Sequence, residues 1–358
     1  MNADHLKLTI CFGESDRVGG RLLSDAIVDL FERHQLRSGV LLRAVEGFGA
    51  KHALRTDRFL TLSEDLPLVA VGIDERPRVE AILPELSSLV SGGLVTLEHV
   101  ELVHGGLVAV ELREELREAV KLTVHLGRDE RVDGRPAYAE VVDHLCAGGL
   151  AGATVLLGVD GMVHRRRQRA RFFSRNEAVP LLVVCVGAGD AVVRALPGLD
   201  ALLIDPVVTL ERAQVCKRDA TFFAEPHRLP VRDDGGLGVW QRLTVYAGEQ
   251  SRHAGHPLSV ELVRRLRTAG AAGATSLRGI WGFSGDHAPH GDRLFHVRRH
   301  VPVVTTIVDT PDRVQRWFRI VDECTTEAGL VTSEFVPACR AVGTDGRIEG
   351  LALARIQY

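Results

Sequence analysis

The sequence lacks the segments that would direct a chain into or across a membrane. No stretch reaches the roughly 18–20 uninterrupted apolar residues that a membrane-spanning helix needs. Residues 1–5 (Met-Asn-Ala-Asp-His) contain an acid and no apolar run, which is not typical of a signal peptide. We therefore predict a cytoplasmic protein.

Cysteine pairs are also missing. The six cysteines are scattered, and no two of them have the Cys-x-x-Cys spacing of a zinc ribbon. They are Cys11, Cys146, Cys185, Cys216, Cys324 and Cys339. We expect free thiols that are mostly buried, as in a reducing cytoplasm, and neither a disulfide framework nor a cysteine metal site.

Short catalytic and phosphate-binding motifs are absent as well. The chain has no Gly-x-Ser-x-Gly, no phosphate-binding Gly-Lys-Ser/Thr and no dinucleotide-binding glycine fingerprint. Its net charge of -3 gives no general attraction to nucleic acid or to an anionic membrane. A hydrophobic content of 45% and a charged content of 25% are typical of a globular protein, and 358 residues suggest about two or three domains.

What the sequence does contain is an internal repeat. Lys-Leu-Thr-Ile at 7–10 returns as Lys-Leu-Thr-Val at 121–124 and as Arg-Leu-Thr-Val at 242–245. The segment Leu-Val-Thr-Leu-Glu at 94–98 has counterparts at 207–211 and 330–334. Glycines recur at matching positions, in the sets Gly13, Gly127, Gly248; Gly20, Gly134, Gly255; and Gly47, Gly161, Gly282.

We divide the chain accordingly. It consists of repeat 1 (1–104), a linker (105–120) that could be helical, repeat 2 (121–217), an irregular linker (218–240), repeat 3 (241–340) and a C-terminal hairpin or tail (341–358). Repeat 2 is the most divergent copy.

Each repeat has the same predicted order of elements. In repeat 1, apolar residues alternate over 6–12 as in a half-buried strand, and Leu23, Ile27, Leu30 and Phe31 fall on one face of a helix. Strands are expected at 40–45, 68–73 and 94–103, with a second helix over 79–90 that Pro84 would kink or delay. The order βαββαβ is that of the ferredoxin-like unit, which leaves one sheet face without helices.

A bare apolar sheet face needs a partner. We therefore predict an α+β fold of three tandem ferredoxin-like domains, whose bare faces pack together as a pseudo-trimer within one chain. The protein would then be a monomer with an intramolecular pseudo-threefold axis.

Several segments together resemble a known family. They are 13–16 (Gly-Glu-Ser-Asp), 46–49 (Glu-Gly-Phe-Gly), 62–67 and 93–96 in repeat 1, with 273–275, 278–283 and 307–309 in repeat 3. They are similar to the PII-like bacterial family known as domain of unknown function 190. Repeat 2 departs from the pattern, with Met162 where an aromatic residue is expected.

The resemblance implies a ferredoxin-like domain that assembles in threes, as PII signalling proteins do. Those proteins bind adenine nucleotides in clefts between subunits, and a mobile loop after the second strand contacts target proteins. Members of the family are sometimes linked to fluoride or other ion handling. An adenine nucleotide or small anion is thus the implied ligand, and a membrane transporter or other protein is the implied partner.

The loop after the second strand of each repeat is the candidate ligand site. Glycines there allow unusual backbone angles, and backbone N–H groups beside basic side chains form an anion cradle. The candidate residues are Arg43, Gly47, Gly49, Lys51, His52, Gly161, Arg165, Arg166, Arg278, Gly282, Gly285 and His287. In the alternative interpretation, the glycines only end strands, and an acidic patch of the same molecule neutralises the arginines.

Other functions have weaker support. The arginines at 165–167 are too short a run, with too few aromatic neighbours, to indicate nucleic-acid binding. The pairs His253/His256 and His287/His290 have no evident third ligand, so we expect surface histidines and no metal. Repeat 2 has Arg128 in place of Glu14, and repeat 3 has Ser251 in place of Asp16 and Trp281 in place of Glu46, which argues against an acid/base pair at every site.

These observations favour a non-enzymatic regulatory or ligand-sensing protein. The open alternatives are a purely structural interaction module, whose loops only dock a partner, and an enzyme with one asymmetric site.

Overall fold

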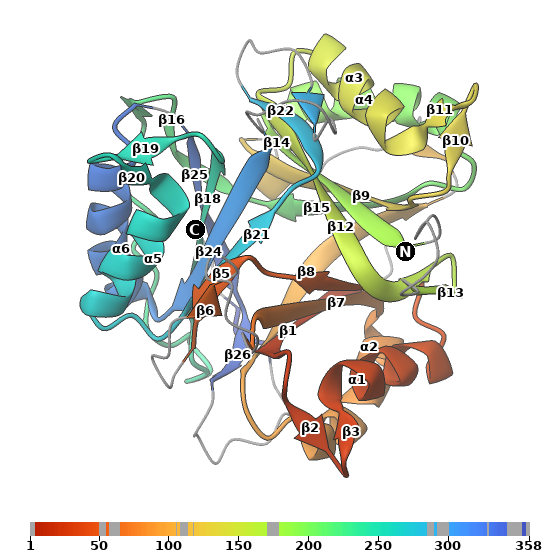
Figure 1. Ribbon diagram of the computed structural model, residues 1–358, viewed down its shortest axis with the longest axis horizontal. Helices are drawn as coiled ribbons and strands as arrows, with labels where there is room; N and C mark the ends of the chain where they lie inside the picture. Colours follow the sequence, from red (N-terminus) through yellow and green to blue (C-terminus); the bar gives the residue numbers. More distant parts are fainter. Residues whose placement is uncertain are drawn as a thin grey trace.

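The computed structural model describes most of the chain. The described residues are 4–49, 55–56, 65–104, 106–107, 114–116, 118–169, 179–284, 290–291, 301–327, 329–341 and 353–355. Three pairs of helices lie on three sides of a central β-structure (Figure 1). No helix within these residues is long and apolar enough to cross a membrane.

The helices come in one pair per repeat. They are α1 (Leu23–Arg33), α2 (Arg76–Leu89), α3 (Ala137–Ala147), α4 (Gly189–Leu202), α5 (Leu258–Thr268) and α6 (Pro311–Cys324). The predicted helical face of repeat 1 is buried in α1, through Leu23, Ile27, Leu30 and Phe31. Pro84 lies inside α2, which begins at Arg76.

The strands of repeat 1 and repeat 2 follow the same order along the chain. In repeat 1 they are β1 (His5–Gly13), β2 (Arg17–Val18), β3 (Arg21–Leu22), β4 (Ser38–Arg43), β5 (Glu46–Phe48), β6 (Arg55–Thr56), β7 (Pro67–Glu75) and β8 (Leu94–His104). In repeat 2 and just after it they are β9 (Val120–Gly127), β10 (Arg131–Val132), β11 (Arg135–Pro136), β12 (Gly152–Val163), β13 (Arg166–Arg169), β14 (Pro180–Gly187), β15 (Val207–Arg212), β16 (Gln214–Arg218) and β17 (Thr221–Phe222).

Repeat 3 carries the remaining strands. They are β18 (Trp240–Gly248), β19 (Arg252–His253), β20 (His256–Pro257), β21 (Ala274–Arg278), β22 (Trp281–Ser284), β23 (His290–Gly291), β24 (Pro302–Asp309), β25 (Leu330–Val336) and β26 (Ala338–Ala341).

The predicted fold of three separate ferredoxin-like domains is wrong. Eight antiparallel strands close into one barrel in the order β14-β9-β15-β8-β1-β7-β4-β12, and β12 pairs again with β14. Four of these strands belong to repeat 1 and four to repeat 2. The seams between the repeats are the β15–β8 and β4–β12 pairs. The first two repeats therefore share one continuous sheet, and neither is a separate domain.

Two long strands close the barrel. Strand β12 pairs with β14 along residues 153–157 and with β4 along residues 158–163. Strand β8 pairs with β1 along residues 94–100 and with β15 along residues 101–104. Each long strand thus has a partner in its own repeat and a second partner in the other. Apolar alternation marks which face of a strand is buried, but it does not mark which edge the strand pairs with.

Repeat 3 is joined to both other repeats. Its strands β25, β18, β24 and β21 lie in a second sheet of order β17-β16-β25-β18-β24-β21-β5-β6, in which β5 of repeat 1 pairs with β21. In addition, β22 pairs with β12 of repeat 2, and β26 pairs with β8 of repeat 1. The hydrogen bonds across these edges satisfy backbone groups that separate domains would leave exposed.

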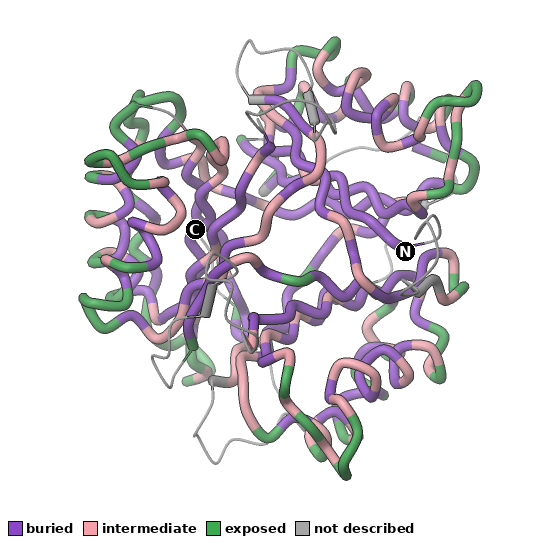
Figure 2. Tube along the Cα trace, in the orientation of Figure 1, coloured by how far each residue is buried: buried purple, intermediate pink, exposed green. Residues whose placement is uncertain are grey.

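The core is divided between the helix pairs and the centre. One apolar cluster lies under each helix pair, and a further cluster around Val40, Leu156 and Val304 joins all three repeats. Figure 2 shows buried backbone along the central strands and exposed backbone in the outer turns. In the first linker the described residues include a 3-10 turn at Glu114–Leu116. The predicted C-terminal hairpin lies mostly outside the described residues.

Candidate functional site

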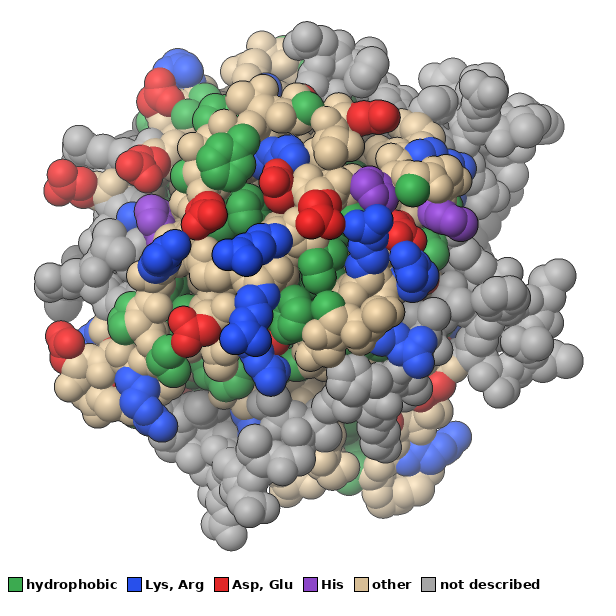
Figure 3. Space-filling model, turned by 90° about the vertical axis from the view of Figure 1, so that its left-hand side faces the viewer, with side chains coloured by type: hydrophobic (Ala, Val, Ile, Leu, Met, Phe, Trp, Pro, Cys, Tyr) green, Lys and Arg blue, Asp and Glu red, His purple; other side chains and the backbone are tan. Residues whose placement is uncertain are grey.

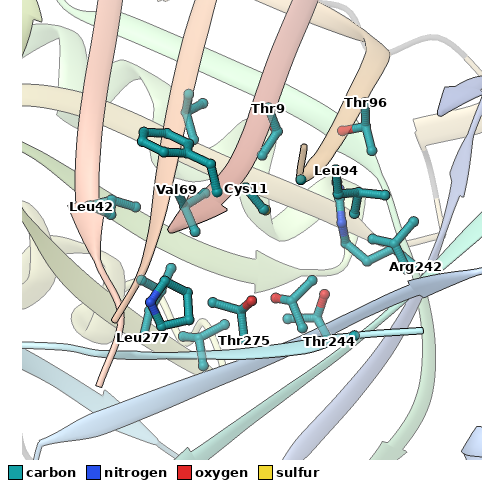
Figure 4. Close-up of a pocket in the computed structure, with 18 of the residues that line it drawn as sticks. Thr9, Cys11, Leu42, Val69, Leu94, Thr96, Arg242, Thr244, Thr275 and Leu277 are labelled. Carbon is teal, nitrogen blue, oxygen red and sulfur yellow. The ribbon is translucent and has the colours of Figure 1, made fainter. Parts of the chain in front are cut away.

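A cavity of about 470 Å³ lies between the three repeats. Strands β1, β9 and β18, the first strand of each repeat, line it with side chains from the sheet faces that helices do not cover. In Figure 4, Thr9 and Cys11 of β1 face Thr244 and Thr275 of repeat 3 across this space. Leu42, Leu156 and Leu277, which occupy related positions in the three repeats, contribute to its apolar wall. The bare faces thus enclose a space large enough for a small molecule.

One end of the cavity is closed by a circuit of buried ion pairs, which we call the ion circuit. Its six members are Lys7, Glu211, Lys121, Glu334, Arg242 and Glu98. Each basic side chain contacts two carboxylates, and each carboxylate contacts two basic side chains. Lys7 Nζ lies 3.3 Å from Glu98, Lys121 Nζ lies 3.2 Å from both Glu211 and Glu334, and Arg242 lies 3.5 Å from Glu334. The remaining contacts are Lys7 with Glu211 and Arg242 with Glu98.

The ion circuit connects the repeats. Lys7, Lys121 and Arg242 hold the same position in the three copies, and so do Glu98, Glu211 and Glu334. Every basic residue pairs with one carboxylate of its own repeat and one of another. The formal charges cancel, which removes the large cost of burying an unpaired charge.

The electrostatics of the ion circuit follow from burial and pairing. Burial alone would raise the pKa of Glu98, but Arg242 and Lys7 outweigh it and hold this pKa below its ordinary value. Glu334 behaves in the same way, because Lys121 and Arg242 outweigh its burial and lower its pKa. Burial would lower the pKa of Arg242, yet Glu98 and Glu334 raise it. Glu98 and Glu334 therefore stay ionised at neutral pH.

Threonines form the next layer of the cavity. Thr9, Thr123 and Thr244 follow the basic residues by two positions on β1, β9 and β18 and therefore face the same side. Thr96 donates to Glu98 at 3.0 Å, and its repeat 3 counterpart Thr332 donates to Glu334 at 2.6 Å. These hydroxyls hold the carboxylates of the ion circuit in place.

Two residues further along, the repeats differ. The matching positions hold a thiol (Cys11), an imidazole (His125) and a phenol (Tyr246), and all three line the cavity. Burial raises the pKa of Cys11 to about 11 and lowers that of His125 to about 3. Burial also raises the pKa of Tyr246. All three groups are uncharged at neutral pH, so the cavity wall is neutral where these three side chains line it.

The cavity opens to solvent beside repeat 1. Its exposed lining residues are Arg17, Gly49 and Ser91, and we call the region formed by these residues with Gly93 and Gly273 the mouth. Gly93 has φ +109°, and a Cβ on it would meet the Cys11 carbonyl oxygen at 2.1 Å. This position therefore requires glycine.

The predicted site residues are not brought together in one place. Among the predicted site residues that the structure describes, Gly49 alone lines the mouth. Arg43 pairs with Glu14 at 2.8 Å, and Arg278, its counterpart in repeat 3, pairs with Glu249 at 3.1 Å. The positions of Lys51, His52, Gly285 and His287 lie outside the described residues.

The predicted glycines sit where strands of different repeats approach closely. A Cβ on Gly47 would meet the Ala274 carbonyl oxygen at 2.7 Å. At Gly161 (φ +145°) it would meet the Gly39 carbonyl oxygen at 2.1 Å, and at Gly282 (φ +156°) the Ala153 carbonyl oxygen at 2.2 Å. This geometry supports a structural role for these glycines, at the edges where the repeats pair.

Acidic side chains of the same molecule contact one of the arginines at 165–167. Arg165 and Arg166 are exposed, but Arg167 contacts Asp160 at 3.0 Å, Glu32 at 2.9 Å and Asp29 at 2.5 Å. On the face that Figure 3 shows, basic and acidic side chains are interspersed rather than gathered by sign. The expectation that nucleic acid is not a partner stays a prediction.

The described residues give little support to a metal site or to an acid/base pair. No group of three or more His, Cys, Asp or Glu side chains within them could hold a metal ion. His253 contacts Arg265 at 3.0 Å, and Glu14 forms an ion pair with Arg43. Glu46 is buried in β5, and Asp16 accepts a hydrogen bond from the Gly13 N–H at 2.8 Å. The predicted absence of enzymatic activity remains untested.

Sequence reasoning missed the ion circuit, although its signal was present. The repeated segments used to find the copies contain both Lys7, Lys121 and Arg242 and the three glutamates. A charged residue that recurs in the middle of a strand, on a face with no helix over it, indicates a buried charge pair. His125 could not be found in this way, because its counterparts are Cys11 and Tyr246.

Comparison with known proteins agrees with the three copies. The family model of DUF190, described as "Uncharacterized ACR, COG1993", matches residues 5–102, 119–215 and 240–338. A UPF0166 protein of Aquifex aeolicus (strain VF5) is 29% identical over 94 residues, which are 26% of this chain and 88% of that protein. The predicted family and the predicted number of copies are confirmed: the chain belongs to the DUF190 family and carries three tandem copies of its domain.

Proposed function

We propose that the chain is a PII-like regulatory protein that senses a small anion or an adenine nucleotide at the mouth of its central cavity. The membership in the DUF190 family supports a regulatory role. The observation that carries the proposal is the cavity itself, which opens between repeat 1 and repeat 3 beside Arg17. Its volume of about 470 Å³ lies within the range of small-molecule sites.

The mouth has the chemistry to hold an anionic group. Arg17 is exposed, donates to the Gly20 carbonyl oxygen at 3.1 Å, and forms no ion pair with a described acidic residue. Residues 91–93 (Ser-Gly-Gly) and Gly273 lack bulky side chains, so a ligand can approach their backbone N–H groups. A phosphate would be held there by Arg17 and backbone groups, with the rest of the ligand inside the cavity.

Output to a partner would pass through the segment after β5. Residues 51–54 and 57–64 follow this strand and lie outside the described residues. The proposed partner is a protein, of which a membrane transporter is one kind, and the proposed location is the cytoplasm. We propose a monomer, because the β4–β12, β12–β22 and β5–β21 pairs occupy the strand edges between repeats.

The experiment is isothermal titration of the full chain with ATP, ADP, AMP and cyclic nucleotides. We expect saturable binding of at least one of them, and a large loss of affinity in Arg17→Glu. Arg131→Glu is the matched control, because Arg131 holds the same position in repeat 2 but does not line the cavity. Absence of heat and of any thermal shift with all these nucleotides would remove the nucleotide from the proposal.

The rival function, a purely structural interaction module, predicts no pocket of nucleotide size between the repeats. The cavity weakens that alternative. An enzyme would require an acid pair facing the pocket. Of the candidate acids, Asp16 lines the cavity and accepts a hydrogen bond from the Gly13 N–H, whereas Glu14 does not line it and pairs with Arg43.

A further inference from the structure

The part of the cavity beside repeat 2 contains two buried polar atoms without a partner. We call this part the inner chamber; it is lined by Thr123, His125, Leu156, Leu182 and Thr209. His125 and Thr209 are each 1% exposed. His125 Nε2 and Thr209 Oγ1 form no hydrogen bond with any described residue. Such atoms are rare in folded proteins, since an unsatisfied buried polar group costs about 1–3 kcal/mol.

The two side chains lie on adjacent strands. Within the β9–β15 pair, Val207 is opposite His125 and Thr209 is opposite Thr123. His125 and Thr209 are therefore diagonal neighbours on the same face, with Cα atoms roughly 7–8 Å apart. One small polar group between them can reach both.

Repeat 2 differs from the other repeats at both positions. The counterparts of Thr209 are Thr96 and Thr332, which donate to Glu98 and Glu334 of the ion circuit. In contrast, Thr209 Oγ1 is not used in this way within the described residues. His125 replaces the Cys11 of repeat 1 and the Tyr246 of repeat 3. At these two positions, among the described residues, the most divergent repeat thus supplies two polar atoms without a partner, whereas Thr96 and Thr332 have one.

The imidazole is held in a fixed position. His125 Nδ1 lies 2.9 Å from Ser38 Oγ of β4, across the barrel from β9. Nε2 is left for a ligand, as a donor or as an acceptor according to the tautomer. A hydroxyl group can donate to Nε2 or accept from it, so it suits either tautomer, and it can bond the Thr209 hydroxyl at the same time.

The surroundings favour an uncharged ligand. The walls carry Leu156 and Leu182, and the nearby charges belong to the ion circuit, in which every member already has two partners. A charged group placed here would lose its hydration without gaining a free counter-charge. We propose that the inner chamber binds an uncharged, mainly apolar small molecule, whose hydroxyl group is held between His125 Nε2 and Thr209 Oγ1.

This site goes beyond the anion site at the mouth and does not depend on it. The test uses 1-naphthol, naphthalene and 1-naphthyl phosphate as probes, with the full chain followed by fluorescence titration. We expect 1-naphthol to bind about tenfold more tightly than naphthalene, as two modest hydrogen bonds allow. We also expect 1-naphthyl phosphate to bind more weakly than 1-naphthol.

Variants test which side chains cause the preference for 1-naphthol over naphthalene. Thr209→Val keeps the shape of the side chain, and His125→Leu replaces the imidazole by an apolar group. Each variant removes one of the two hydrogen bonds and should reduce the preference for 1-naphthol to about threefold. The control is Thr306→Val, the same change on the wall of repeat 3, and it should leave the preference intact. Circular dichroism confirms that each variant is folded, and Thr209→Val tests the proposal even if His125→Leu fails to fold.

Three results would overturn the proposal. They are no saturable binding of 1-naphthol, equal affinity for 1-naphthol and naphthalene, or a tenfold preference that is not reduced in either His125→Leu or Thr209→Val. Arg17→Glu separates the two sites, because it should abolish nucleotide binding and leave the preference for 1-naphthol unchanged. A failure of the nucleotide titration therefore says nothing against the inner chamber.

Discussion

Residues at matching positions of the three repeats are alike where the structure requires it and differ elsewhere. The basic residue of the first strand is kept as Lys7, Lys121 and Arg242, because each completes the ion circuit. Four positions later the side chain differs in chemistry, from thiol to imidazole to phenol. Glycine is kept at 47, 161 and 282 because strands of different repeats pass too close there for a side chain. Conserved backbone contacts, rather than ligand contacts, thus explain these glycines.

Gly161→Ala tests this explanation. The new methyl group would clash with the Gly39 carbonyl oxygen, and the backbone has φ +145°. We expect the free energy of unfolding to fall by about 1–3 kcal/mol, as measured by urea denaturation. Gly49→Ala is the control, since a Cβ there meets nothing within 4 Å, and it should change stability little. Equal stability of the two variants would contradict the structural role of Gly161.

Strands are the elements that join the repeats. The length of β8 and β12 lets each pair with two partners, one in each of the first two repeats. The ion circuit adds side-chain contacts between strands that the described sheets do not pair with each other, since Glu98 lies on β8 and Arg242 on β18. Side-chain pairing therefore joins the repeats at places where backbone pairing does not.

Arg242→Met tests the contribution of the ion circuit. The change leaves Glu98 and Glu334 buried with one basic partner fewer, and breaking a buried pair in this way costs about 3–5 kcal/mol. We expect a loss of this size in the free energy of unfolding, together with a lower melting temperature. Arg194→Ala removes the exposed pair with Asp190 and should have no measurable effect. A melting temperature that does not change in Arg242→Met would show that the buried contacts contribute no stability.

At the scale of the whole molecule, the ion circuit makes stability depend on pH. The folded-state pKa values of Glu98 and Glu334 lie below the ordinary value of 4.5, which applies to the unfolded chain. A carboxyl group with a depressed pKa stabilises the folded state above its unfolded pKa, and this contribution is lost as pH falls toward the folded pKa.

We therefore expect the free energy of unfolding to decline steadily below about pH 4.5, where the unfolded carboxylates take up protons first. Urea denaturation at several pH values between 7 and 3 measures this decline. In Glu98→Gln one of the two groups is gone, so the pH dependence should be shallower than in the unchanged chain. Stability that is independent of pH over this range would contradict the assignment.

Much of the local structure could be predicted from the sequence. The spacing of Leu23, Ile27, Leu30 and Phe31 predicted α1, and the alternation over 6–12 predicted β1, because periodicity reports directly which face is buried. The candidate site could be predicted only in small part. Gly49 lies at the mouth, but Arg17, His125 and Thr209 were missed, since their roles depend on residues distant in sequence.

The sequence by itself determined the three copies, their family and the alternation that leaves one sheet face bare. Those properties depend on short-range spacing and on residues that recur along the chain. Only the tertiary structure decided that β15 pairs with β8 and that β4 pairs with β12, which merges two copies into one barrel. It also decided that six charges meet at one end of a shared cavity. Edge pairing and charge pairing across repeats depend on distances in space, which a periodic pattern does not contain.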